Sequence, residues 1–250
     1  MGQKVICHGH SLLDDLVGNI SYFQLLVLNA TGRLPDERLA KWLEASYMCL
    51  SWPDPRIWCN QIGSLAGSTQ TSPVAAASAG ILASDSHLYG PGVIPDVVSF
   101  IIQALKDFKS GKSIQEIVAG YARRPGTKPK IPGYNRPILS SDERVPAMER
   151  VTKELEFSRG EHLSLAYEIE KHLLDQYKEG MSIAIYFLAF LCDQNFSLQE
   201  IYRILSIMVA SGVTACYTEA LENPPESFLP LRCDDIEYKG PEKRPVPDSN

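Results

Sequence analysis

The chain has 250 residues, enough to bury a core in one large domain or in a large and a small one. Apolar residues make up 44% and charged residues 22%, as in ordinary soluble globular proteins. The formal net charge of −6 argues against a general nucleic-acid-binding protein, because binding phosphates requires clustered positive charge.

Apolar residues recur at helical spacing and are separated by Pro- and Gly-rich breaks, a pattern that predicts consecutive helices. Pro73 begins an alanine-rich segment whose small side chains allow close helix–helix approach. Alternating strand patterns are absent, so we expect an all-α protein with about nine to eleven helices. We expect these helices at residues 12–29, 36–50, 56–67, from 73 onward, 93–109, 113–121, 144–157, 161–178, 182–192 and 198–222.

The most apolar stretch, residues 183–192, is about half the length needed to cross a bilayer, so it predicts a buried helix and no membrane association. The start of the sequence, MGQKVICHGH, is too short and polar for a secretory signal, and we expect a cytoplasmic protein. The six cysteines form no CxxC pair and are expected to be reduced, mostly as core residues. His8 and His10 have no acidic or cysteine cluster beside them, so no metal site is predicted.

A proline-rich irregular stretch, residues 123–142, carries five basic side chains. Rigid loops with basic side chains are suited to binding phosphates or carboxylates, although a solvated surface loop would have the same composition. Phosphate-binding glycine loops and the GxSxG nucleophile motif are absent from the sequence, so composition and spacing alone name no reaction.

Five segments of the chain contain motifs that follow one another in the same order as the motifs of a known protein family. They are LDDLVGNISYFQLLVLNATGRLP (13–35), LAGSTQTSPVAAASAGILASDSHLYGPG (65–92), IPGYNRPILSSDER (131–144), GVTACYTE (212–219) and YKGPEKRPVP (238–247). Together they resemble the citrate synthase superfamily over nearly the whole chain, and the short length resembles its citryl-CoA-lyase-type members.

The resemblance implies a homodimer of all-α subunits, each with a large helical domain and a smaller mobile one. The large domain would comprise residues 1–92 and 205–250, and the small domain residues 93–204. The family condenses a CoA thioester with a 2-oxo acid such as oxaloacetate, or runs the reverse cleavage. A carboxylate base moves the α-proton, histidines polarise the carbonyls and arginines hold the carboxylates.

Most of the catalytic side chains that the family uses are replaced in this chain. The histidine of the family's HGG turn is replaced by Tyr89, and the histidine of its PGxGH segment by Arg136, or by Asn135 if the alignment shifts by one residue. The general base falls at Ala184, and Cys216 replaces a further histidine. Ordinary citrate synthesis is therefore not expected, since base and donor each contribute about 10²-fold or more to the rate.

The side chains that bind substrate carboxylates in the family are better retained than its catalytic residues. Arg144 and Arg232 match two arginines that face oxo-acid carboxylates, with Arg232 acting in its own subunit or in a second one. Arg136 would hold a further anion, and Tyr89 would orient or protonate a substrate oxygen. A CoA thioester is a candidate substrate, with no other cofactor required. Its binding is expected at Pro132, Gly133 and Tyr134, with Lys128 and Lys130 near the phosphates.

Two functional hypotheses follow from the loss of catalytic side chains together with the retention of carboxylate-binding arginines. The chain is either a repurposed enzyme that makes or breaks a carbon–carbon bond in a carboxylic acid or CoA thioester, or a catalytically silent homologue that binds a ligand or a sister subunit. Convergence of Arg144, Arg232 and Arg136 would favour the enzyme. A cleft filled by apolar side chains would favour the silent homologue. An unrelated helical protein is the third alternative.

Overall fold

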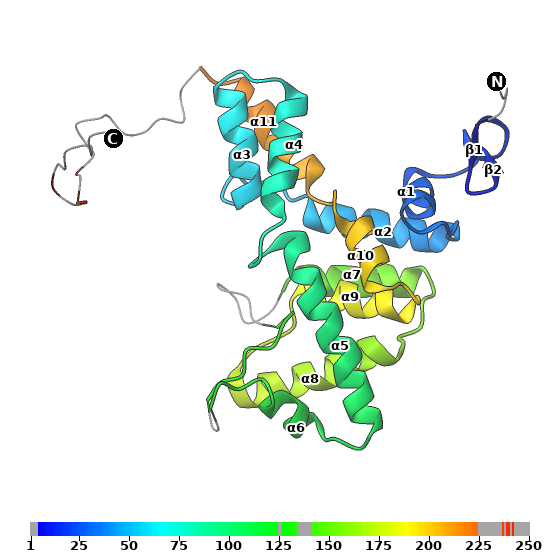
Figure 1. Cartoon of the computed structure of the whole chain (residues 1–250), viewed down its shortest axis with the longest axis vertical. Helices are drawn as coiled ribbons and strands as arrows, with labels where there is room; N and C mark the ends of the chain where they lie inside the picture. The colour runs from blue at the N-terminus through cyan, green and yellow to red at the C-terminus, as the bar shows by residue number, and fades with distance from the viewer. Residues whose placement is uncertain are drawn as a thin grey trace, which may run out of the picture.

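The computed structural model describes residues 5–124, 127–134, 142–224, 237, 239, 240 and 242. In this part of the chain there are eleven α-helices and one short hairpin, which confirms the all-α prediction (Figure 1). The helices are α1 (Tyr22–Thr31), α2 (Glu37–Leu50), α3 (Trp58–Ser68), α4 (Pro73–Ser84), α5 (Ile94–Lys109), α6 (Ile114–Ala119), α7 (Arg144–Glu154), α8 (Glu161–Tyr177), α9 (Ile183–Asp193), α10 (Leu198–Leu205) and α11 (Ala210–Leu221).

The N-terminal region differs from the single helix that the periodicity predicts. A π-helical turn, η1 (Leu12–Leu16), is followed by a break in which Gly18 has a φ of 82°. Helix α1 then begins after Ser21, whose hydroxyl accepts the N–H of Gln24 while the Gln24 side chain accepts the N–H of Ser21. This reciprocal cap starts a new helix where apolar spacing alone suggests continuity.

Ahead of this region lies a hairpin that the sequence pattern does not predict. Strands β1 (Ile6–Cys7) and β2 (His10–Ser11) pair antiparallel through a turn in which His8 and Gly9 both have positive φ angles. Such a turn suits a tight hairpin. Strands of this length are too short to produce an alternating pattern.

The hydrophobic core is built around α9, which is buried along most of its length. The indole of Trp42 on α2 stacks on the ring of Phe190 on α9, with ring centroids 4.0 Å apart. The prediction that residues 183–192 form a buried helix is confirmed. Helices α1 and α2 thus share a core with α5 and α9, across the predicted boundary at residue 92, and the two-domain division stays a prediction.

Helices α3, α4 and α11 pack tightly against one another and form what we call the three-helix unit, at the top of Figure 1. A side chain at Gly80 of α4 would overlap Val213 of α11, and one at Gly63 of α3 would overlap the Val213 carbonyl oxygen. Small residues therefore permit the close approach that the alanine-rich segment predicts. Three connections, residues 51–57, 85–93 and 206–209, join the unit to the other helices.

The predicted helix at 198–222 is divided into α10 and α11 by a turn at residues 206–209. Taken together, residues 198–221 are long and apolar enough to cross a membrane by length and composition. Of their most apolar window, 44% is buried inside the molecule, and core helices of soluble proteins pass the same test of length and composition. This stretch is thus weak support for a membrane segment.

Candidate functional site

The arginine that the family resemblance assigns to a substrate carboxylate is held by an aspartate. Arg144 begins α7, and its guanidinium donates from Nε to Asp142 Oδ1 and from Nη2 to Asp142 Oδ2, both at 2.8 Å. The Asp142 side chain is fully buried, whereas that of Arg144 is 22% exposed. The N–H of Ile183 also donates to Asp142 Oδ2, at 2.9 Å, so the pair joins the starts of α7 and α9.

The electrostatics of the pair keep Asp142 charged. Burial raises the pKa of the Asp142 carboxyl, but the hydrogen bonds and positive charge of Arg144 and the N–H of Ile183 outweigh it, and the net pKa lies below the usual value. Ala184, the residue that the family resemblance predicts at the position of the general base, follows Ile183 directly and is half-buried. Asp142 lies close to this predicted position but is a poor substitute for a base, because an ion-paired carboxylate with a lowered pKa accepts protons poorly.

Cys49, in the last turn of α2, belongs to the same neighbourhood. Burial raises the pKa of its thiol, the charge of Arg144 opposes this and the charge of Asp142 adds to it. The sequence offers no signal for this residue, because only the tertiary fold brings the end of α2 to the start of α7.

Tyr89, the candidate proton donor, lies in the connection between α4 and η2 (Gly90–Val93). Its ring is 47% exposed and lies against the indole of Trp58, with centroids 5.3 Å apart. The Trp58 Nε1–H donates to the carbonyl of Ala83 at 2.7 Å, which anchors that indole. The described residues supply no hydrogen bond to the Tyr89 hydroxyl, so this phenol is available to a ligand.

The predicted CoA-binding turn is rigid and packs against the start of α9. Gly133 has a φ of 85°, and its carbonyl oxygen accepts the N–H of Ser182 at 3.0 Å and the Ser182 hydroxyl at 2.8 Å. Tyr134 is only 4% exposed, and its hydroxyl donates to the carbonyl of Ala166 at 2.7 Å. Its ring belongs to the core, and Gly133 packs against Ile185 of α9, so Pro132 and Gly133 are only half-exposed.

The two predicted phosphate-binding lysines have different surroundings. The Lys128 ammonium lies 2.5 Å from Oε1 of Glu179, a buried carboxylate that partly neutralises it. Lys130 is exposed, and the described residues supply no ion pair to its ammonium. Lys130 is thus the freer of the two cations.

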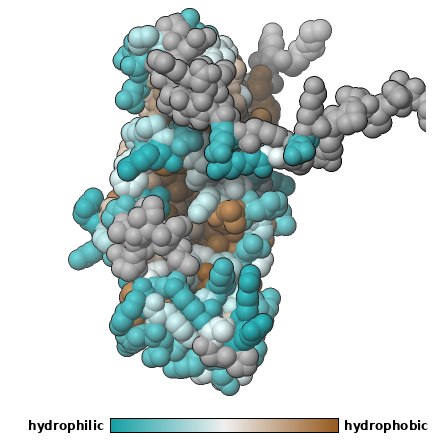
Figure 2. All heavy atoms as spheres, turned by 90° about the vertical axis from the view of Figure 1, so that its left-hand side faces the viewer, coloured by the Kyte–Doolittle hydropathy of each residue, from teal (hydrophilic) through white to brown (hydrophobic). Residues whose placement is uncertain are grey.

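The structure brings Arg144, the Gly133 turn and Ala184 together at the start of α9. Tyr89 lies in the connection that joins the three-helix unit to α5. Figure 2 shows apolar surface between the upper and lower parts of the molecule. Asn135, Arg136 and Arg232 lie outside the described residues, so the roles predicted for them and for the other site residues stay predictions.

Known structures share this arrangement of helices. The chain is similar to citryl-CoA lyase from Hydrogenobacter thermophilus, with a TM-score of 0.81 and 26% identity over 99% of this chain and 94% of that one. It is also similar to ATP citrate lyase from Methanothrix soehngenii in complex with citrate and coenzyme A, with a TM-score of 0.73 and 17% identity over 97% of this chain and 41% of that one.

A further similar structure is the citrate synthase from Pyrobaculum aerophilum, with a TM-score of 0.64 and 17% identity over 91% of this chain and 55% of that one. The two structures at 17% identity show the likeness of fold alone. A scan against protein-family models gives no match, and a search of curated proteins gives none either.

Proposed function

We propose that this chain, which has the citrate synthase superfamily fold, binds a small di- or tricarboxylic acid, free or as its CoA thioester, and makes or breaks a carbon–carbon bond in it. The observation that carries the proposal is the Asp142–Arg144 pair at the start of α9. Asp142 accepts two N–H groups of the Arg144 guanidinium and so fixes the direction of the remaining ones. Those remaining groups can bind a substrate carboxylate, because the planar donors of arginine match the geometry of a carboxylate.

Tyr89 and the basic loop supply the remaining binding groups. A half-exposed phenol whose hydroxyl has no hydrogen bond from the described residues can donate to a substrate oxygen, where the family uses histidine. For a CoA thioester, Lys130 would face the phosphates, and the half-buried turn at Pro132 and Gly133 would contact the nucleotide or pantetheine. Lys128 would contribute less charge, because Glu179 shares it.

A second function, ligand binding without turnover, is favoured by one specific observation. Ala184 provides no general base, and the nearby carboxylate of Asp142 is committed to Arg144 and Ile183. The two functions share the binding step and differ only in chemistry. They are therefore separated by measuring binding and turnover on the same sample.

Isothermal titration with citrate, oxaloacetate, acetyl-CoA and CoA tests the binding step. We expect at least one ligand to bind, and Arg144→Ala to weaken that binding about 10- to 100-fold, the contribution of a charge-assisted hydrogen bond. Arg150→Ala is the matched control, because Arg150 lies on the same helix and, among the described residues, its ion pair is with the exposed Glu154. No binding by any of the four at millimolar concentration would contradict the proposal.

Turnover is then measured by incubating the protein with citryl-CoA and following acetyl-CoA and oxaloacetate by mass spectrometry. Product formation that Arg144→Ala and Tyr89→Phe reduce, and Arg150→Ala does not, supports the enzyme. Binding without product supports the silent homologue.

We further infer that two copies of the chain associate through the three-helix unit. Helix α4 contains no charged residue, and its outer face exposes Val74 (74%) and Leu82 (78%). The unit is built largely on glycine and alanine contacts and its buried residues are absent from the main hydrophobic core. An uncharged outer face on a unit with so little core of its own fits a second copy of the same surface.

Light scattering coupled to size-exclusion chromatography tests this association. We expect a dimer for the native chain and a monomer for Leu82→Glu. Phe108→Glu is the control, because Phe108 is an exposed apolar residue (46%) on α5, outside the unit. A native chain that elutes as a monomer at micromolar concentration would overturn the inference.

A further inference from the structure

A pocket of about 440 Å³ lies between α10 and the connection from α4 to α5. Its lining includes Asp85, His87, Pro95, Leu198 and Arg203. The volume is in the range of small-molecule sites, which are mostly apolar with a few placed polar groups. None of these residues belongs to the candidate site at the start of α9.

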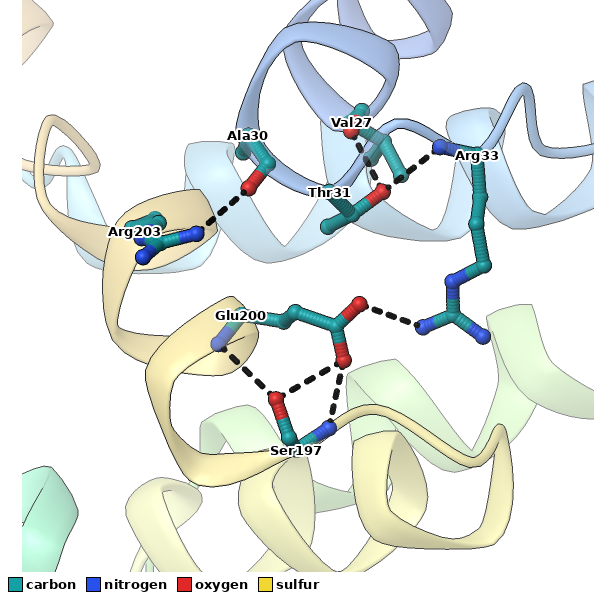
Figure 3. A network of polar contacts seen from close by, with 7 residues as sticks. All are labelled: Val27, Ala30, Thr31, Arg33, Ser197, Glu200 and Arg203. Carbon is teal, nitrogen blue, oxygen red and sulfur yellow. Dashed lines mark hydrogen bonds and ion pairs between the residues drawn. The ribbon is translucent and has the colours of Figure 1, made fainter.

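The α10 wall of the pocket is fixed by its helix cap and by contacts with the end of α1 and the residues after it. On α10, Ser197 and Glu200 form a reciprocal helix cap, and Glu200 pairs with Arg33 at 3.4 Å (Figure 3). Arg203 donates from Nη1 to the carbonyl of Ala30, at the end of α1, at 3.3 Å (Figure 3). The wall is therefore held in place before any ligand arrives.

The opposite wall is equally constrained. The N–H of Ser86 donates to the Tyr89 carbonyl at 3.3 Å, and a side chain at Gly92 would overlap the Ser86 carbonyl oxygen. The hydroxyl of Tyr202 on α10 donates to Asp85 Oδ2 at 2.7 Å and ties the two walls together. The pocket is thus preformed, which lowers the entropic cost of binding.

Two exposed and oppositely charged side chains, Asp85 and Arg203, line the pocket. No described residue forms an ion pair with either of them, although the charge of Arg203 also lowers the pKa of Glu200. Asp85 receives one hydrogen bond from Tyr202 on Oδ2, and no described residue donates to Oδ1. Arg203 uses one of its donors on the Ala30 carbonyl, and a guanidinium has five. A purely anionic ligand would meet the Asp85 carboxylate, and a purely cationic one would meet Arg203.

We propose that this pocket binds a small zwitterion of the α-amino-acid class with an apolar side chain. The ligand ammonium pairs with Asp85, its carboxylate pairs with Arg203, and its side chain lies on Pro95 and Leu198. Each charge of the ligand then meets its opposite, and the mixed-charge lining rejects ligands that carry only one charge. Tyr89 belongs to the same turn as Ser86, so occupancy would also steady the phenol of the candidate site.

Titration of the full-length protein with L-leucine and L-phenylalanine, followed by NMR or calorimetry, tests the proposal. The matched probes are 4-methylpentanoate, which lacks the amine, and isopentylamine, which lacks the carboxylate. We expect an amino acid to bind about two- to fivefold more tightly than either probe, the contribution of one solvent-exposed ion pair.

Variants locate the binding. Asp85→Asn should remove the preference for the amino acid over 4-methylpentanoate, whereas Asp96→Asn, an exposed carboxylate outside the lining, should preserve it. Binding that is equal for the amino acid and the acid in the native chain would overturn the zwitterion assignment. No binding by any probe at millimolar concentration would overturn the site itself, whatever the outcome at Arg144.

Discussion

Arg144 and Asp142 form a bidentate ion pair, Nε to Oδ1 and Nη2 to Oδ2, at 2.8 Å each, with the carboxylate fully buried. The same carboxylate accepts the N–H of Ile183, so one side chain couples two helices and the candidate site. Asp142 therefore links the packing of α7 and α9 to the orientation of Arg144.

Replacing Asp142 by Asn should destabilise the protein by about 2–3 kcal/mol at neutral pH, because a partly buried guanidinium loses its counter-charge and its charged hydrogen bonds. In the unfolded chain the pKa of Asp142 is about 4, as for any aspartate. In the folded protein its pKa is lower. Its contribution is therefore complete above that unfolded value and is lost as the pH falls through the folded one. Urea unfolding should show a large difference between native chain and variant at neutral pH, and a smaller one in acid.

Glu37→Gln is the control for this experiment. Glu37 pairs with Lys41 on the solvent-exposed side of α2, and its removal should change stability little. An equal loss of unfolding free energy in the two variants would show that burial does not set the strength of the Asp142–Arg144 ion pair.

Gly80→Ala should destabilise the three-helix unit by about 1–3 kcal/mol, since its methyl group would overlap the Val213 side chain. Adding Val213→Ala should recover part of the loss, because the obstructing atoms belong to a side chain. Gly63→Ala should not be recovered by Val213→Ala, because there the obstruction is the Val213 carbonyl oxygen. Thermal unfolding of the single and double variants measures both effects.

Gly120→Ala is the matched control for the glycine variants. A methyl group there would lie no closer than 3.4 Å to the nearest carbonyl oxygen outside its neighbours, so it should be tolerated. A loss at Gly120 equal to that at Gly80 would contradict the close-approach explanation.

Thr152→Val should cost about 1–3 kcal/mol, because it breaks a buried hydrogen-bonded chain. The Thr152 hydroxyl accepts from Trp42 Nε1 at 2.8 Å and lies 2.8 Å from the Tyr186 hydroxyl. Valine leaves the indole N–H without its partner, whereas Thr152→Ser keeps it. Chemical denaturation should rank serine above valine, and the reverse order would show that the methyl group, and not the hydroxyl, is what stabilises the core.

Cys192 should resist alkylation in the native protein. Burial, together with the charge of Asp193, raises the pKa of its thiol to about 12. The reactive thiolate is therefore scarce at mildly alkaline pH. Peptide mapping after iodoacetamide treatment should find Cys192 unmodified in the native chain and modified in urea. Rapid native labelling would contradict its position in the core.

Local signals account for what sequence patterns predicted well. Helical periodicity identified the buried run at 183–192, and Pro73 marked the start of α4, because both depend on neighbours within a few residues. The ordered family segments likewise predicted a citrate-synthase-like fold, which the similarity to citryl-CoA lyase supports over 99% of the chain. The same patterns missed the hairpin at residues 6–11 and the breaks after residues 16 and 205, where turn geometry and capping overrule apolar spacing.

Helical class and the order of the helices follow from patterns among residues near one another in the chain, whereas the loss of the general base at Ala184 stays a prediction from the family resemblance. Three relationships appear only once the helices are packed: Asp142 holds Arg144 against α9, Tyr134 belongs to the core, and Asp85 and Arg203 line one pocket. These relationships join residues tens to more than a hundred positions apart. Packing of the helices brings them together, and no local pattern encodes which distant partners will meet.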